Sequence, residues 1–257
     1  MLMLRGFPQK GVLNANMKHF RNIICLLAAG CLLRGIPVAA EGYGQGRERD
    51  ALNRPAGALN FQSEYAQHGA FALSDDPNRI ILTFDQGYEN GFTPKILDTL
   101  KEKNATAIFF LTGDYAKKEP ELVRRMIAEG HMLGNHGMTH AAIPTLNTQA
   151  LEEEVMSLHS YVQQQYGYAM QYFRPPCGEY DVCSLDKVQS LGYRTVFWSA
   201  AYVDWKTDAQ PEPAAALREL TDMAHGGAIY LLHSVSETNA EILGSLIDAL
   251  REKGYTV

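Results

Sequence analysis

The stretch Ile80-Ile81-Leu82-Thr83-Phe84-Asp85-Gln86 decides the fold, because in it an apolar strand ends on a carboxylate. A run of β-branched and aromatic residues of this length predicts a buried strand over residues 80–84. Asp85 directly follows that run, so it would stand at the carboxyl end of the strand.

Similar short runs recur from Arg79 to the end of the chain, with helical patterns between them. The strand candidates are residues 80–84, 107–111, 132–134, 171–173, 195–198, 228–232 and 255–257. This alternation is typical of repeated βα units around a mostly parallel sheet or barrel, so we expect an α/β fold. Residues 79–257 are long enough to form one domain with a full hydrophobic core.

The clearest helical pattern begins near Thr148, whose hydroxyl can accept a hydrogen bond from the first turn. Four apolar residues at three-to-four spacing give this helix one core-facing side: Leu151, Val155, Leu158 and Val162.

The first 40 residues have the layout of an export signal. Two basic residues precede an apolar run over residues 23–33, and the small residues Val38-Ala39-Ala40 offer a cleavage site after residue 40. Met17 is a possible true start, because residues 1–16 add nothing that such a signal needs. We therefore expect an exported protein.

Two other fates of this segment remain open. The apolar run could anchor the protein in a membrane, although it is about half of the ~20 residues that a spanning helix needs. Cys31 could be lipidated, although the apolar stretch continues past this cysteine. Cleavage fits the length of the run best, and it would leave no stable membrane insertion.

Residues 41–78 are rich in Gly, Arg, Asn, Gln, Ser and Asp and have no sustained apolar period, so we expect an extended leader there. Cleavage of the signal would leave two cysteines, Cys177 and Cys183. In an oxidising compartment they could close a short loop, or they could stay unlinked.

The charge balance excludes one class of partner. The chain has 23 Lys and Arg against 29 Asp and Glu, a formal net charge of −6. This charge gives no electrostatic support for binding a phosphate backbone, so we expect no nucleic-acid partner.

Five polar residues follow predicted strands: Asp85, His136, Arg174, Asp204 and His233. In a βα barrel the carboxyl ends of all strands gather on one face, so residues that are distant in sequence converge there. Each of them alone is more often a satisfied structural residue. Five of complementary chemistry at equivalent positions predict a functional site.

His136 and His140 are four residues apart, a spacing that puts two imidazoles one helical turn apart and lets them bind one metal ion. Isolated pairs with this spacing also arise by chance. His159 and His225 have no partner at ligand spacing, so we expect them to be structural or exposed.

Arg174 stands in the segment Phe173-Arg174-Pro175-Pro176-Cys177-Gly178. Proline fixes φ and has no N–H, which suits a loop whose next amide must point at a ligand. An ordinary turn with a surface arginine is the alternative interpretation of this segment taken alone.

Together these residues resemble the polysaccharide deacetylases that share the NodB homology domain. The resemblance covers roughly residues 79–257 and five motifs in the family's order: Thr83-Phe84-Asp85, His136-x-x-x-His140, Arg174-Pro175-Pro176, Asp204-Trp205 and Leu231-Leu232-His233. Residues 83–91, 196–199 and 227–233 are most similar to the muramic-acid deacetylases of spore-forming bacteria. That branch prepares muramic δ-lactam in spore-cortex peptidoglycan.

The resemblance implies a distorted (β/α) barrel that hydrolyses an acetamide with one divalent metal ion. Asp85 would be the general base, His136 and His140 would hold the metal, and His233 would be the general acid. This division of roles is chemically reasonable, because an amide is a poor electrophile with a poor leaving group. Its hydrolysis needs an activated water, a stabilised oxyanion and a proton donor to nitrogen.

The resemblance also implies supporting roles for five further residues. Arg174 would hydrogen-bond the general base, and Asp204 would hold Arg174 in turn. Trp205 and Leu232 would form the walls of the acetyl-methyl pocket. The amide of Cys177 would contribute to the oxyanion site, since the preceding proline has no N–H.

Gln86 is the main departure from the family, most of whose members have a second Asp there as the third metal ligand. The muramic-acid branch resembles this chain in lacking that carboxylate. Gln86 could bind the metal through its carbonyl oxygen or leave the position to water. Gly137, where the family usually has a hydroxyl residue, is a smaller departure. Zinc, cobalt and manganese all suit two imidazoles with oxygen or water.

Three functional hypotheses follow. The first is de-N-acetylation of N-acetylmuramic acid in peptidoglycan glycan strands, in the cell envelope or the spore intermembrane space. The second keeps the chemistry and changes the substrate to chitin oligomers, peptidoglycan N-acetylglucosamine or acetylated xylan; the Gln86 departure argues against it. The third is a non-catalytic glycan-binding module. The retention of Asp85 and His233 argues against that module, because binding requires no base and acid pair.

Overall fold

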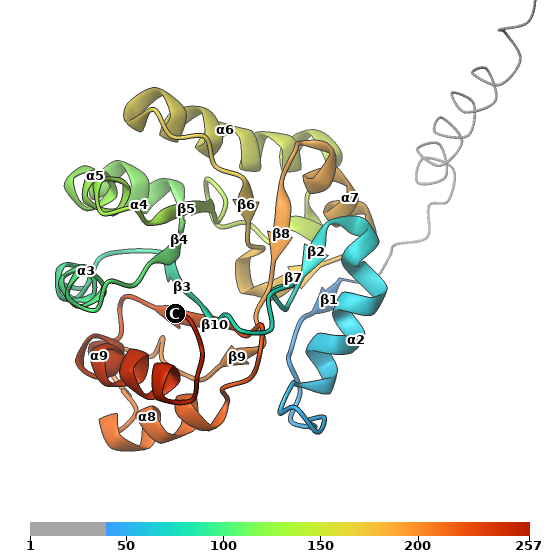
Figure 1. Cartoon of the computed structure of the whole chain (residues 1–257). Coiled ribbons are helices and arrows are strands. Elements are labelled where there is room, and N and C mark those ends of the chain that lie inside the picture. Colours follow the sequence, from blue (N-terminus) through green and yellow to red (C-terminus); the bar gives the residue numbers. More distant parts are fainter. Residues whose placement is uncertain (1–39) are drawn as a thin grey trace, which may run out of the picture. The chain divides into compact units, whose positions relative to one another are not determined.

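The computed structural model describes residues 40–257 (Figure 1). The expected export signal, with Met17 and its apolar run, lies outside these residues. Within the described part of the chain, no helix combines the length and the apolar character needed to cross a membrane.

A curled sheet of eight strands forms the centre of the domain. Its order is β2-β8-β6-β5-β4-β3-β10-β9, and all neighbouring strands are parallel. The strands are β2 (Ala70–Phe71), β3 (Ile81–Gln86), β4 (Ala107–Leu111), β5 (Met132–Asn135), β6 (Tyr172–Phe173), β8 (Arg194–Val196), β9 (Ala200–Ala201) and β10 (Ile229–His233). An antiparallel bridge between Leu73 and Ala228 connects the segments next to β2 and β10 and closes the curl. The expected α/β fold, a distorted (β/α) barrel, is confirmed.

Helices surround this sheet on its outer side (Figure 1). They are α2 (Ala56–Tyr65), α3 (Thr93–Glu102), α4 (Gly113–Lys118), α5 (Pro120–Ala128), α6 (Thr148–Tyr166), α7 (Val182–Ser190), α8 (Pro213–Asp222) and α9 (Glu237–Glu252). Short 3₁₀ turns lie at Ala66–His68, Ile143–Thr145 and Pro176–Gly178, and β1 (Glu41–Gly42) pairs with β7 (Glu179–Tyr180).

Both faces of the sheet are buried, which explains why its strands are continuous apolar runs in the sequence. In β4, Phe109 and Leu111 belong to the large core between sheet and helices. Ile108 and Phe110 belong to a separate apolar cluster with Val196. Successive side chains of a strand point to opposite faces, so β4 contributes to both clusters.

Residues 41–78 are not an extended leader, because they contain α2 and β2. The side chain of Phe61 is buried, and its ring centroid lies 4.8 Å from that of Tyr43 and 4.5 Å from that of Phe197. The hydroxyl of Tyr43 donates a hydrogen bond to the carbonyl of Trp198. The buried residues of α2, Ala58, Phe61 and Tyr65, do stand at three-to-four spacing, but only Phe61 is strongly apolar, so the helical pattern is weak in the sequence. The domain therefore begins before residue 79.

The structure also differs from the expectations for the end of the chain and for the cap of α6. Residues 255–257 make one isolated parallel bridge, between Thr256 and Arg79, rather than a strand. The side chain of Asn147, and not that of Thr148, caps α6 by accepting a hydrogen bond from the Ala150 amide. The four apolar residues expected on the inner side of α6 are all buried.

The aromatic cluster predicts that residues 41–65 unfold together with the barrel. Phe61→Ala should lower the free energy of unfolding by about 3–5 kcal/mol, because it empties a buried aromatic site. Denaturant unfolding measures this change. Leu52→Ala is the control, since Leu52 is 66% exposed and its loss should cost no more than about 0.5 kcal/mol. Equal stability of the two variants would show that this segment does not contribute to the domain.

Candidate active site

The carboxyl ends of the strands bring together the polar residues that the sequence singles out. Asp85 lies in β3, and the register of the sheet places it opposite His233, the last residue of β10. His136 directly follows β5, and Arg174 directly follows β6. Because all these strands are parallel, the four side chains share one end of the barrel.

Arg174 is fully buried and is bound on every side. One guanidinium nitrogen, Nη1, donates to Asp85 Oδ1 at 2.8 Å and to Thr83 Oγ1 at 2.7 Å. Nε and Nη2 donate to the carbonyls of Val196 and Phe197 at 3.0 and 3.2 Å. The expected contact between Arg174 and Asp85 is therefore present, and Thr83 is a partner that motif reasoning did not assign.

Asp85 is held as an anion. Burial is the largest single effect and would by itself raise the pKa of its carboxyl, but the charge and the hydrogen bond of Arg174, together with nearby histidines, outweigh it. The charges of His136 and His233 act in the same direction, so the pKa of Asp85 lies below its usual range. Its second oxygen, Oδ2, lies 3.6 Å from Nε2 of His136.

Asp204 does not hold Arg174; it pairs with His233. Asp204 Oδ1 lies 2.7 Å from Nδ1 of His233, and Oδ2 accepts from the backbone amide of the same residue at 2.8 Å. Asn239 of α9 also donates to Oδ2, at 2.6 Å. The expected arrangement fails because hydroxyl, carboxylate and carbonyl oxygens already surround the guanidinium, while β9 leads Asp204 to the side of β10.

The pairing with Asp204 makes His233 a better base than a free imidazole. Burial by itself would lower the pKa of His233, but the hydrogen bond and the charge of Asp204 raise it, with a further contribution from Asp85. Since a carboxylate can only accept, Nδ1 carries a proton and Nε2 is the ring atom available to a substrate.

His136 has the opposite character. Its Nδ1 donates to the carbonyl of Arg174 at 2.8 Å, so the neutral ring keeps the lone pair on Nε2, the form that binds metals. Burial lowers the pKa of His136 to about 4, although the charge of Asp85 opposes this effect. The ring centroid of His140 lies 4.8 Å from that of His136.

The third position expected to bind metal is occupied by an amide. Gln86 Nε2 donates to Ser234 Oγ at 2.6 Å, and Oε1 is buried without a hydrogen-bond partner. Within residues 40–257, no three His, Cys, Asp or Glu residues are grouped so that they could hold a metal ion. The donors that remain are two imidazoles and one unsatisfied amide oxygen, which suits a metal site with few anionic ligands.

Two of the three residues expected to contact substrate are exposed. Trp205 is 49% exposed, and its ring centroid lies 5.8 Å from that of His233. Cys177 is exposed and has a left-handed backbone with φ 57°. Cys177 and Cys183 both lie in the described part of the chain, and no disulfide joins them to each other.

Leu232 is misassigned as a wall of the substrate pocket. It is buried in the core between sheet and helices. Side chains alternate along β10, so Leu231, two residues before His233, shares the face of this histidine. His159 and His225 are structural, as expected: the first pairs with the Tyr193 hydroxyl at 2.6 Å, and the second is buried.

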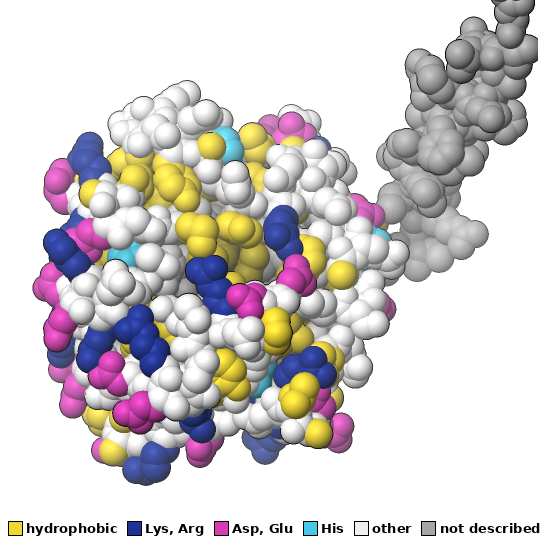
Figure 2. Space-filling view, in the orientation of Figure 1, with side chains coloured by type: hydrophobic (Ala, Val, Ile, Leu, Met, Phe, Trp, Pro, Cys, Tyr) yellow, Lys and Arg dark blue, Asp and Glu magenta, His cyan; other side chains and the backbone are white. Residues whose placement is uncertain are grey.

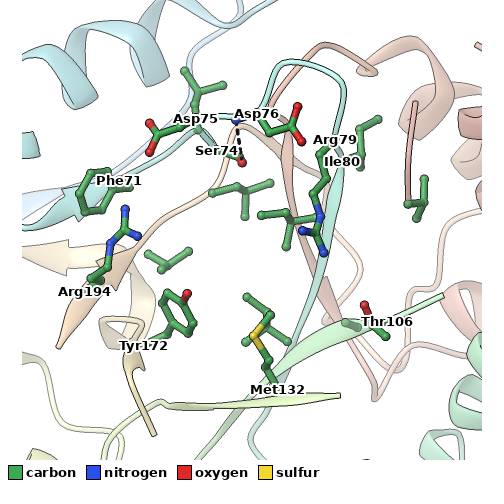
Figure 3. A pocket seen from close by; sticks show the side chains of 17 residues that line it. Phe71, Ser74, Asp75, Asp76, Arg79, Ile80, Thr106, Met132, Tyr172 and Arg194 are labelled. Carbon is green, nitrogen blue, oxygen red and sulfur yellow. Dashed lines mark hydrogen bonds between the residues drawn. The ribbon is translucent and has the colours of Figure 1, made fainter. Parts of the chain in front are cut away.

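A separate cavity of about 310 Å³ lies at the opposite, amino ends of the strands (Figure 3). Its lining includes the first residues of six strands: Ile81, Ala107, Met132, Tyr172, Arg194 and Ile229. Figure 2 shows hydrophobic side chains around the hollow on this face, with charged side chains at its edge. Two arginines, Arg79 and Arg194, and two aspartates, Asp75 and Asp76, are among the lining residues, so side chains of both charges stand there. The lining contains none of the polar residues at the carboxyl ends.

The geometry predicts that Asp204 controls the protonation of His233. In Asp204→Asn the raising charge is lost and the lowering effect of burial remains, so the pKa of His233 should fall. NMR titration of the imidazole measures it. Asp208→Asn, which removes an exposed carboxylate on the same loop, should leave the titration unchanged. An unaltered pKa in Asp204→Asn would contradict the assigned pairing.

Comparisons with known proteins identify the family. Residues 73–196 match the family described as polysaccharide deacetylase. The peptidoglycan-N-acetylmuramic acid deacetylase PdaA of Bacillus subtilis is 40% identical over 245 residues, 93% of each chain. Its structure, described as a family 4 carbohydrate esterase, superposes with a TM-score of 0.81 and 39% identity over 86% of this chain and 95% of that one. A peptidoglycan-N-acetylglucosamine deacetylase of Bacillus cereus is 33% identical over 72% of this chain and 68% of the relative. The chain belongs to the polysaccharide deacetylase family.

Proposed function

We propose that the protein removes the N-acetyl group from N-acetylmuramic acid in peptidoglycan by metal-assisted hydrolysis. The observation that carries the chemistry is the pair of opposed groups at one end of the barrel. Arg174 stabilises the anion of Asp85, and Asp204 raises the pKa of His233. Two titratable groups whose pKa values are pushed apart are suited to act as base and acid in one reaction.

In this mechanism Asp85 takes the proton of the attacking water. Its pKa lies below the usual range, so it stays ionised at neutral pH but is a weak base, and the water needs further acidification. A bound divalent ion would supply this by polarising the water and the acetyl carbonyl. His136 and His140 would hold the ion, with Gln86 Oε1 as a further oxygen donor. Zinc, cobalt and manganese all fit this donor set.

His233 completes the reaction from the other side. The proton on Nε2 is the one it gives to the departing amine, because Nδ1 is engaged by Asp204. Trp205, exposed beside this ring, would form one wall of the acetyl pocket, and Leu231 replaces Leu232 as the apolar residue on that face. The amide of Cys177 is the proposed donor to the oxyanion, alongside the metal.

Similarity supports N-acetylmuramic acid as the substrate. The relative named for this activity is 40% identical over 93% of the chain, whereas the relative named for N-acetylglucosamine is 33% identical over 72%. We further propose that the protein acts outside the cytoplasm, on glycan strands whose muramic acid lacks peptide. There the freed amine can form the δ-lactam with the lactyl carboxyl of the same sugar, as in spore cortex.

Acetate release from peptidoglycan stripped of peptide by an amidase tests this function. We expect release with added divalent metal, and loss of release with a chelator. Asp85→Asn should lower the rate by about 10²–10⁴-fold, the usual contribution of a general base. Asp208→Asn is the matched control and should keep the rate.

The other outcomes separate the remaining hypotheses. Release from chitin oligomers, N-acetylglucosamine units or acetylated xylan in preference to muramic acid would support a different substrate. No release from any of them, with glycan bound equally well by wild type and Asp85→Asn, would identify a binding module.

A further inference from the structure

The loop over residues 137–141 carries His140 and directly follows His136. Its backbone is left-handed at two positions, Gly137 with φ 85° and His140 with φ 62°. A left-handed conformation is unfavourable for a residue with a Cβ atom, so other contacts must hold His140 in it. The side chain of His140 is exposed, and therefore packing does not orient it.

The carboxylate of Glu154, in α6, supplies these contacts. Oε1 accepts hydrogen bonds from the amides of Thr139 and Ala141, at 2.7 and 3.3 Å, and these residues flank His140. Oε2 accepts from the Thr139 hydroxyl at 2.8 Å. Backbone amides that converge around a left-handed residue form a concave anion site, and here a buried carboxylate of the same chain occupies it.

Gly137 makes room for this carboxylate. A Cβ atom at residue 137 would lie 2.5 Å from Glu154 Oε1, too close for any side chain unless Glu154 moves. The amide of Gly137 donates to Asn135 Oδ1 at 2.9 Å, and the amide of Met138 donates to the Glu154 carbonyl at 3.0 Å. The loop is thus fixed at four amides, and three of these bonds go to Glu154.

We propose that Glu154 is the positioning residue that sets His140 against His136 for binding one metal ion. This inference rests on the metal site of the proposed function. Glu154 acts through the backbone on both sides of His140, so its loss would free that imidazole from its place 4.8 Å from the other ring. Loss of Glu154 should therefore weaken metal binding directly, and it should slow the reaction only through that weaker binding.

Titration of Co²⁺ into the metal-free protein tests the inference. Calorimetry and the visible absorption of the bound ion both report the Kd. In Glu154→Ala the Kd should rise about 10- to 100-fold, as for other groups that orient metal ligands. Glu154→Gln should bind nearly as wild type does, because its carbonyl can accept both amides and its NH₂ can donate to Thr139 Oγ1. Glu153→Ala, which removes an exposed acid one residue earlier on α6, is the control and should not change the Kd.

The outcomes distinguish this inference from the proposed function. Wild type that binds no Co²⁺ would contradict the metal site and the inference together. Wild type that binds, with Glu154→Ala binding equally well, would overturn the inference alone. Should Glu154→Ala fail to fold, Glu154→Asp provides the test, because it keeps the negative charge but is one methylene too short to reach the amides of Thr139 and Ala141 from the same position. A Kd in Glu154→Asp equal to that of wild type would then overturn the inference.

Discussion

The buried pair of Asp85 and Arg174 is the interaction on which the rest of the site depends. Arg174 is fully buried, and a buried charge is tolerated only when it is paired and its donors are satisfied. Its partners come from β3, from the last residue of β8 and from the residue after it, so the guanidinium binds only where the curl of the sheet brings these ends together. Removing one partner of such a pair typically costs about 3–5 kcal/mol. The same contact keeps Asp85 anionic, so fold and chemistry share one interaction.

From this pair the site divides into two halves of opposite character. Arg174 holds a carboxylate in its charged form on one side, and Asp204 favours the charged form of His233 on the other. His136, which Arg174 binds through its backbone carbonyl, stays neutral with Nε2 free. The histidine loop is held from a different direction, by Glu154 of α6. Base, acid and imidazole ligands are thus each positioned by a separate partner.

The sequence predicted the strands and the convergence of their polar ends for a physical reason. Strands buried on both faces must be apolar throughout, and parallel strands present their carboxyl ends together. Partners across the barrel cannot be predicted, because spacing does not say which acid faces which base; the resemblance pairs Asp204 with Arg174, whereas the structure pairs it with His233. The face on which Leu232 lies is not visible either, because every residue in this part of β10 is apolar.

Two other features left weak traces in the sequence. The helix α2 has only three buried residues, Ala58, Phe61 and Tyr65, and although they stand at three-to-four spacing, alanine and tyrosine give a weak apolar pattern. Glu154 stands in a run of three glutamates, and its position three residues after Leu151 places it on the inner side of α6, but only the structure shows which groups it binds. Gly137 gave a hint, because a missing side chain at that position indicates that another group fills the space.

Carbon NMR of the Asp85 carboxyl as a function of pH is the decisive measurement for this pair, with the signal assigned by its absence in Asp85→Asn. We expect Asp85 to stay ionised below the range in which ordinary aspartates titrate, because the charge and the hydrogen bond of Arg174, with the nearby histidines, outweigh the effect of burial. Titration at or above the ordinary value of about 3.9 would contradict it, since burial would then outweigh the pair.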